Sequence, residues 1–145
     1  MTQSLEKSIL QKIVVKLSGL ISEELRLLKK KQSYQELLEY FAGKRKTFDI
    51  PLKQNGTDFQ MRVWEALRQI PYGKTVTYKD IAKKVGNEKA SRAVGMANHN
   101  NPICIIVPCH RVIGKNGDLT GYAEGLNVKE KLLKLEANNS FSNRH

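Results

Sequence analysis

The sequence predicts an α+β protein whose C-terminal part is mainly helical. Three observations support this prediction. Helix-start signals precede apolar residues at helical spacing, a short β-rich apolar run occupies Ile103–Val107, and 145 residues can bury one modest core plus a small appendage. We expect an N-terminal subdomain over 1–54, a second domain over 55–138 and a flexible tail over 139–145.

The first 50 residues give weak signals. Ile9–Leu17 could be a strand, and Leu20–Lys31 could be a second strand or a helix. Ser33 and Glu36 match a capping box, which predicts a short helix that begins there and runs through Phe41.

A stop and a boundary follow this helix. Gly43 suits the end of a helix, and Lys46–Leu52, which contains Pro51, reads as an edge strand or a linker. Asn55-Gly56 is a turn signal, so we place the domain boundary next to it.

The middle of the chain predicts three helices. Thr57 and Gln60 form a capping box before apolar residues at helical spacing, and Pro71 and Gly73 end that run. Two short helices follow, Tyr78–Val85 capped by Thr77 and Glu88–Asn98 capped by Asn87, with Gly86 between them. This pair is a helix-turn-helix candidate.

The last third combines a strand, a loop and a helix. Ile103–Val107 reads as a buried strand that Pro108 stops, so Cys109 would begin at the end of a strand. A glycine-rich loop spans 114–125, and Asn127 with Glu130 predicts a last helix that frays after Ala137.

Composition narrows the possible partners. Twenty-five Lys and Arg against fourteen Asp and Glu give a net charge of +11, which favours a polyanion such as nucleic acid, although a basic solvated surface has the same charge. The chain lacks a membrane-length apolar run, a secretory signal, a disulfide framework and metal-ligand spacing. We therefore expect a cytoplasmic protein, or a nuclear one in a eukaryote, without a cofactor or metal.

The second helix of the helix-turn-helix candidate has two distinct faces. Ala90, Ala93, Val94 and Ala97 share one face, and Arg92, Gly95, Met96 and His99 share the opposite one. The first set would pack inward, and an exposed Arg beside Gly would allow close approach to DNA. An ordinary amphipathic helix has the same pattern.

Cys109 is the candidate nucleophile. A thiol needs a neighbouring base, and His110 is adjacent in sequence, although adjacent side chains diverge and a water would have to bridge them. Glu136 lies on the apolar stripe of the last helix, where burying a carboxylate without a hydrogen-bond donor is costly. A His that donates to this carboxylate would be oriented and made more basic. A buried structural thiol is the alternative, and it is our interpretation of Cys104.

A series of short motifs then follows in order along the chain. They are Gly56-Thr57-Asp58-Phe59-Gln60, Ile70-Pro71-Tyr72-Gly73, Thr77-Tyr78, Arg92-Ala93-Val94-Gly95, Asn101-Pro102, Ile106-Val107-Pro108-Cys109-His110-Arg111-Val112-Ile113, Gly121-Tyr122 and Lys129 to Glu136. Together they closely resemble the O6-alkylguanine-DNA alkyltransferases over roughly residues 33–137. The resemblance implies a reduced ribonuclease H-like α/β subdomain, then a winged-helix-like helix-turn-helix with a short active-site strand.

The resemblance also implies a function, direct-reversal DNA repair. Cys109 would accept the alkyl group of O6-alkylguanine, and possibly of O4-alkylthymine, irreversibly and once per molecule, after the base flips out of the duplex. His110 would take the thiol proton through water, Glu136 would orient His110, Tyr78 would supply a proton to the guanine, and Asn101 would be a hinge.

Two further residue sets follow from the resemblance. The DNA-binding set, on a monomer that reads the minor groove with little sequence specificity, is Thr77, Tyr78, Lys89, Ala90, Ser91, Arg92 and Gly95. The substrate-pocket set is Met96, Val112, Tyr122, Ala123 and Glu124, of which Ala123 and Glu124 depart from the usual family residues. The zinc ligands of some members are absent.

Three rival interpretations remain. An alkyltransferase-like protein would bind lesions without catalysis, but such proteins replace the acceptor cysteine, which is present here as Cys109. A helix-turn-helix regulator would leave Cys109, His110 and Glu136 without a role. A thiol hydrolase would not need a DNA-binding element beside its Cys-His pair.

Overall fold

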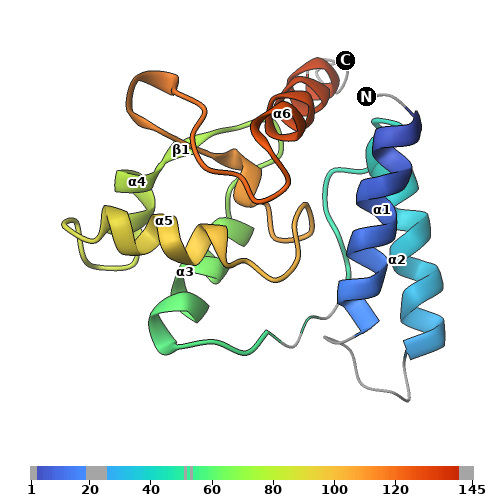
Figure 1. Cartoon of the computed structure of the whole chain (residues 1–145), viewed down its shortest axis with the longest axis horizontal. Helices are drawn as coiled ribbons and strands as arrows, with labels where there is room; N and C mark the ends of the chain where they lie inside the picture. Colours follow the sequence, from blue (N-terminus) through green and yellow to red (C-terminus); the bar gives the residue numbers. More distant parts are fainter. Residues whose placement is uncertain (1–2, 19–25, 51, 53, 141–145) are drawn as a thin grey trace. The chain divides into compact units, whose positions relative to one another are not determined.

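The computed structural model describes residues 3–18, 26–50, 52 and 54–140. It divides into two compact units, Met1–Gln54 and Asn55–His145 (Figure 1). We describe each unit by itself. None of the helices in the described ranges is both long and apolar enough to span a membrane.

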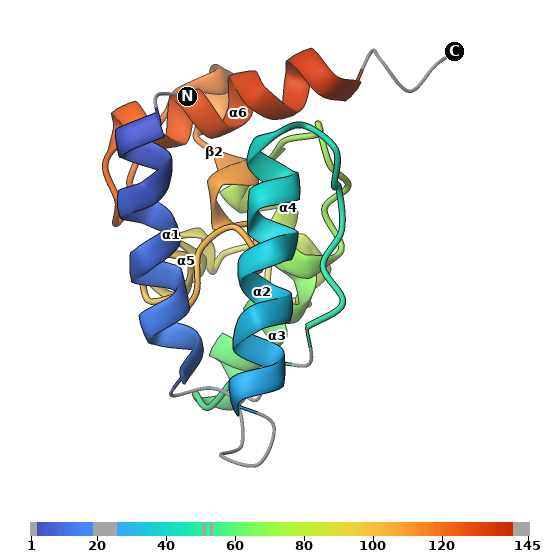
Figure 2. The same ribbon diagram turned by 90° about the vertical axis from the view of Figure 1, so that its right-hand side faces the viewer.

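Unit 1 is a pair of helices, α1 (Gln3–Ser18) and α2 (Arg26–Phe41), which lie side by side and antiparallel (Figures 1 and 2). Ile9–Leu17, which the sequence left open as a possible strand, lies in α1, so the strand interpretation is wrong. Ile9, Leu10 and Ile13 are buried, and this spacing of three and four residues matches the period of a helix. The described residues of this unit contain no strand, so the predicted α/β subdomain is wrong for them; residues 20–25 lie outside the described residues.

The predicted capping box at Ser33 and Glu36 is also wrong, because both residues lie inside α2. Glu36 is buried and accepts hydrogen bonds from the Gln32 side chain (2.6 Å) and from the backbone N–H of Asp49 (3.0 Å). Its carboxylate therefore ties the segment after α2 to the helix. The predicted stop is confirmed, since Gly43 follows Phe41 with a φ of +77° that favours glycine. The described part of Lys46–Leu52 forms no strand.

Unit 2 opens with a helix whose predicted start is confirmed. In α3 (Asp58–Arg68) the Thr57 hydroxyl accepts from the backbone of Gln60, and the Gln60 side chain accepts from the backbone of Thr57. The reciprocal capping of α4 (Tyr78–Lys84) by Thr77 and Asp80 is equally complete. The predicted cap at Thr77 is therefore confirmed.

The second helix of the pair, α5 (Ser91–His99), begins three residues later than predicted. Asn87 closes a turn instead, because its carbonyl accepts from the backbone N–H of Ala90 (3.0 Å). α4 and α5 pack against each other and against α3, and the indole of Trp64 on α3 donates to the carbonyl of Ala97 (2.9 Å). This arrangement is a helix-turn-helix.

The predicted strand over Ile103–Val107 is wrong. All five residues are buried, but they form a compact turn in which the N–H of Val107 reaches the carbonyl of Ile103 (3.4 Å) and Ile105 has a φ of +68°. A β-branched residue rarely adopts that conformation, so the turn is strained. Burial explains the apolar run, and an apolar run alone does not separate a strand from a buried turn.

The remaining elements of unit 2 include a short two-stranded sheet and a last helix. A 3₁₀ turn η2 (Cys109–Arg111) leads into strand β2 (Val112–Ile113), which pairs in parallel with β1 (Val76–Thr77). After a second 3₁₀ turn, η3 (Lys115–Gly117), helix α6 (Leu126–Ser140) contacts η2. α6 begins before Asn127, so the capping box with Glu130 is wrong. It also continues beyond Ala137, so the predicted fraying there is wrong; residues 141–145 lie outside the described residues.

The Thr57 cap provides a stability test. Replacing Thr57 with Ala removes an N-cap acceptor, so we expect the free energy of unfolding to fall by about 1 kcal/mol. Urea unfolding followed through Trp64, the one tryptophan of the chain, reports on unit 2. Thr47→Ala, at an exposed position outside any helix, is the matched control and should leave the midpoint unchanged. Equal effects of both substitutions would contradict the role of the cap.

Candidate active site

A buried carboxylate organises the site. Glu136 on α6 is 1% exposed, and its oxygens lie 2.5 Å from His110 Nε2, 2.8 Å from Arg111 Nε and 3.1 Å from Arg111 Nη2. The backbone N–H of Gly73 donates to the same carboxylate at 3.2 Å. The predicted meeting of His110 with Glu136 is therefore present, and Arg111 joins it.

These contacts determine the charge of each group. Burial alone would raise the pKa of Glu136, but contacts with His110 and Arg111 outweigh it and hold that pKa well below its usual range. Burial lowers the pKa of His110, and the positive charges of Arg111 and Lys129 reinforce the effect against the opposing influence of Glu136. The predicted influence of Glu136 is confirmed, since its charge and its hydrogen bond both raise the pKa of His110, but burial outweighs them and the net direction is downward.

The tautomer of His110 follows from this arrangement. An ionised carboxylate only accepts hydrogen bonds, so Nε2 of His110 carries the proton that faces Glu136. Nδ1 is then the basic nitrogen, and it is buried without a hydrogen-bond partner among the described residues. His110 thus presents an unused acceptor on the side of its ring opposite Glu136.

Cys109 lies in a similarly enclosed environment. The residue is 5% exposed, and burial raises the pKa of its thiol. The polar side chains of Asn101 and Tyr122 and the charge of Lys129 act in the opposite direction and lower this pKa. Three separate segments therefore supply groups that favour the thiolate.

Asn101 also shapes the backbone that carries Cys109. Its side-chain amide donates to the carbonyls of Ile103 (3.0 Å) and Val107 (2.9 Å), the two ends of the strained turn. The sequence placed Asn101 at the junction between the helix-turn-helix and the cysteine segment. In the structure its two hydrogen bonds tie the ends of the Ile103–Val107 turn to this junction.

A second polar cluster lies around the carbonyl of Thr120. This oxygen accepts from the hydroxyl of Tyr78 (3.1 Å) and from Nζ of Lys129 (2.7 Å). The ammonium group of Lys129 lies 6.0 Å from the centroid of the Tyr78 ring, within cation–π range. Burial lowers the pKa of Lys129 to about 8.

The outer face of α5 carries the predicted DNA-contacting residues. Arg92, Met96 and His99 are exposed, while Val94 and Ala97 are buried as predicted. Ala93 is exposed and Asn98 is buried, so the predicted inner face is rotated slightly. Met96, which we had assigned to the substrate pocket, is 63% exposed on this outer face.

The other predicted residues differ in how exposed they are. Lys89 is exposed in the turn before α5, and Ala90 and Ser91, at the start of the helix, are half-buried. Tyr122 and Val112 are buried. Ala123 is exposed and Glu124 is half-buried in the tight turn between Tyr122 and Gly125.

The sequence did not predict two residues of the site, Arg111 beside Glu136 and Lys129 beside the carbonyl of Thr120. Arg111 is 5% exposed, donates to the carbonyl of Ile70 (2.7 Å) and lies 5.6 Å from the centroid of the Tyr72 ring. Lys129 is fully buried. Lys129 lies seven residues before Glu136 and so shares its helix face, so the argument that singled out Glu136 applies to Lys129 as well.

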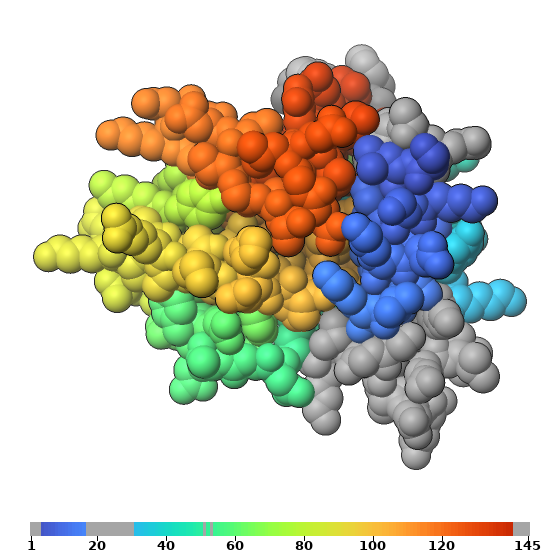
Figure 3. Space-filling model, in the orientation of Figure 1, coloured from blue at the N-terminus to red at the C-terminus, as the bar shows by residue number. Residues whose placement is uncertain are grey.

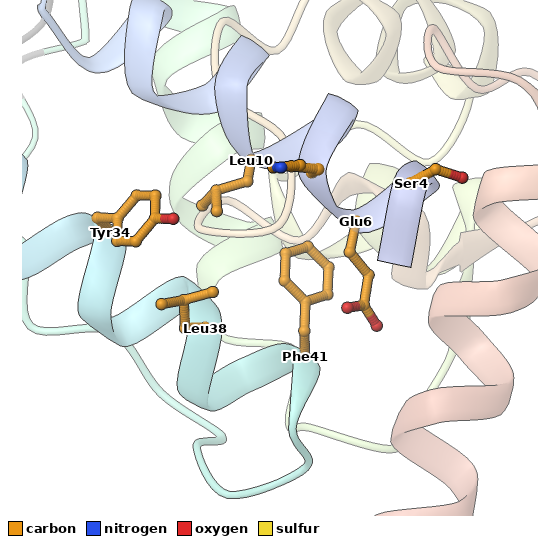
Figure 4. Close-up of a pocket in the computed structure, with 7 residues that line it drawn as sticks. Ser4, Glu6, Leu10, Tyr34, Leu38 and Phe41 are labelled. Carbon is orange, nitrogen blue, oxygen red and sulfur yellow. The ribbon is translucent and has the colours of Figure 1, made fainter. Parts of the chain in front are cut away.

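Unit 1 contains a separate groove between α1 and α2 (Figure 4). It is lined by Ser4, Glu6, Lys7, Leu10, Tyr34, Leu38 and Phe41. None of the predicted site residues lines this groove.

The geometry supports nucleophilic chemistry at sulfur. A buried thiol, a neutral imidazole with a free nitrogen and an oriented carboxylate together form an activated-nucleophile arrangement. A helix-turn-helix in the same unit presents cations to solvent. The site therefore combines thiol chemistry with a surface suited to a polyanion.

Known proteins share this combination. A family model described as "6-O-methylguanine DNA methyltransferase, DNA binding domain" matches residues 58–138. A "Methylated-DNA--protein-cysteine methyltransferase" of Methanosarcina acetivorans is 63% identical over 106 residues, which are 73% of this chain and 68% of that protein. The constitutive enzyme of that name from Bacillus subtilis is 58% identical over 106 residues, 72% of this chain and 64% of that protein.

A solved structure agrees with these matches. The chain is similar to Mycobacterium tuberculosis OGT in complex with DNA, with a TM-score of 0.75 and 54% identity. The similarity covers 76% of this chain and 68% of that one.

Removing the Lys129 charge tests its influence on the thiol. We expect Lys129→Met to raise the pKa of Cys109 and to slow its alkylation by iodoacetamide at pH 8 roughly three- to ten-fold. The assay uses a Cys104→Ala background, which leaves Cys109 as the one thiol. Lys134→Met makes the same change on α6 at a side chain that is 70% exposed, and it should leave the rate unchanged. Equal rates in both variants and the parent would contradict the proposed influence.

Proposed function

The chain belongs to the 6-O-methylguanine DNA methyltransferase family, and we propose that Cys109 is the residue to which it transfers the alkyl group of O6-alkylguanine in DNA. The protein is a methylated-DNA–protein-cysteine methyltransferase that repairs DNA by direct reversal. The observation that carries the assignment of Cys109 is its position, directly before the buried His110–Glu136 pair.

In the proposed reaction a carbon–sulfur bond replaces a carbon–oxygen bond. Sγ of Cys109 attacks the alkyl carbon, the bond to O6 breaks, and the guanine leaves. The thiol proton passes to Nδ1 of His110 through a bridging water, and Tyr78 supplies a proton to the departing guanine. The thioether has no route back to a thiol, so each molecule reacts once.

Glu136 and Lys129 support this step without touching the alkyl group. Glu136 accepts from Nε2 of His110 and so leaves Nδ1 as the base. It also stabilises the imidazolium that forms when Nδ1 takes the proton. The positive charge of Lys129 favours the thiolate.

On the DNA side, α5 is the proposed recognition helix. A buried cysteine cannot reach a base inside the duplex, so the modified nucleotide has to rotate out of the stack. We assign Arg92, exposed on α5, to the space that the nucleotide leaves, and Tyr78 and Thr77 at the start of α4 to the backbone of the target nucleotide. Lys89, Ala90, Ser91 and Gly95 complete the contact with the minor groove.

The pocket for the flipped base would lie beside Cys109. Tyr122, which interacts with the thiol, would form one wall, and Val112 would offer backbone groups to the base. Ala123 and Glu124, in the turn that follows Tyr122, would limit the size of the alkyl group. We propose that a monomer carries out the reaction, with O4-alkylthymine as a second possible substrate.

Mass spectrometry of the intact protein tests the assignment of Cys109. After incubation with duplex DNA containing O6-methylguanine, the protein should gain the mass of one methylene, since S–CH₃ replaces S–H. Cys109→Ser should gain nothing, and the matched Cys104→Ser should gain the same mass as the parent. An unchanged parent that still binds the lesion tightly would favour a non-catalytic lesion binder.

Salt dependence tests the mode of DNA binding. We expect the logarithm of affinity for duplex DNA to fall linearly with the logarithm of salt concentration, because Lys and Arg displace counterions from phosphates. Unrelated duplexes of equal length should bind within about threefold of one another, since minor-groove contacts carry little sequence information. A strongly preferred operator sequence would favour a helix-turn-helix regulator.

A further inference from the structure

Met96 is the most exposed large apolar side chain of α5. Its side chain is 63% exposed. By contrast, Val94 and Ala97 on the inner face of the same helix are 0% and 2% exposed. Leaving a large thioether in water forgoes the free energy of its burial. In the space-filling view the outer side of α5, drawn in yellow, is open (Figure 3).

The neighbours of Met96 identify the kind of surface it belongs to. Arg92 lies one helical turn before it and His99 three residues after it, so all three share the outer face of α5. Gly95, next to Met96, has open space where a side chain would stand, with nothing within 4 Å of an added Cβ. Met96 therefore projects beside a cation from a locally thin part of the helix.

A positive, narrow helix face matches the chemistry of duplex DNA. The chain carries a net charge of +11, and no acidic residue lies within α5. Proteins that work in the minor groove frequently insert apolar side chains, methionine among them, between base steps and so unstack them. A long unbranched thioether reaches into such a gap and adapts to its shape.

We propose that Met96 is an apolar wedge that enters the minor groove beside Arg92 and helps to unstack the bases around the lesion. This inference rests on the proposed function of α5 as the recognition helix. Met96 is then a positioning residue, which acts on the availability of the base and not on the chemistry at Cys109. This role replaces its assignment to the base pocket.

The test compares Met96→Gln, which keeps the length of the side chain and adds polarity, with Met96→Leu, which keeps it apolar. Met61→Gln on α3 is the matched control, because Met61 is also exposed, at 40%, but lies on another helix. Single-turnover rates are measured with O6-methylguanine in a duplex and with the free base. We expect Met96→Gln to lower the ratio of the duplex rate to the free-base rate about tenfold. Met96→Leu and Met61→Gln should stay near the parental ratio.

A binding readout keeps the test independent of methyl transfer. 2-Aminopurine placed beside the lesion should brighten when the parent protein binds and unstacks it, and brighten less with Met96→Gln. An equal loss of rate on the duplex and the free base would return Met96 to the base pocket and overturn the proposal. Unchanged 2-aminopurine signals would also overturn it. Failure of the parent to transfer a methyl group would instead contradict the proposed function.

Discussion

The rest of unit 2 depends on the buried carboxylate of Glu136. Removing an ionised carboxylate from water is costly unless several donors replace the lost hydration. Here His110, Arg111 and the backbone of Gly73 supply them, from η2 and from the segment between α3 and β1. One side chain on α6 therefore joins three parts of the chain that lie far apart in sequence, and it orients the imidazole next to the nucleophile.

The same arrangement explains why the thiol of Cys109 stays protonated until it reacts. Burial lowers the pKa of His110 more than Glu136 raises it, which keeps the imidazole neutral, and burial also raises the pKa of Cys109. Solvent electrophiles thus meet an enclosed thiol and not an exposed thiolate. Asn101, Tyr122 and Lys129 bring the thiol closer to ionisation from their separate positions, so reactivity depends on the intact pocket.

Local signals predicted the elements that local interactions determine. The starts of α3 and α4 follow from Thr57 and Thr77, whose capping hydrogen bonds lie within four residues. The turn over Ile103–Val107 could not be told from a strand, because burial makes strands and turns equally apolar and no sequence signal marks the positive φ of Ile105. A strand over Ile9–Leu17 was wrong because a short apolar run fits a strand and a buried helix face alike, and the α/β subdomain was inferred from a resemblance that begins only near residue 33.

Part of the active site could also be predicted from the sequence. Glu136 stood out as a charge on an apolar helix stripe, and the partner it needed was His110. Arg111 was not predicted as a partner of Glu136, because its bidentate contact joins residues 25 positions apart and no local sequence signal marks it. Met96 was assigned to the pocket from resemblance, and only the packing of α5 shows that its side chain faces outward.

The protonation state of His110 can be measured directly. Nitrogen-15 chemical shifts of the imidazole at pH 7, assigned against variants of His99 and His145, report which nitrogen carries the proton. We expect a neutral ring with the proton on Nε2, facing Glu136, and a bare Nδ1. An imidazolium, or a neutral ring with its proton on Nδ1, would contradict it, because Nδ1 could then not accept the proton of Cys109.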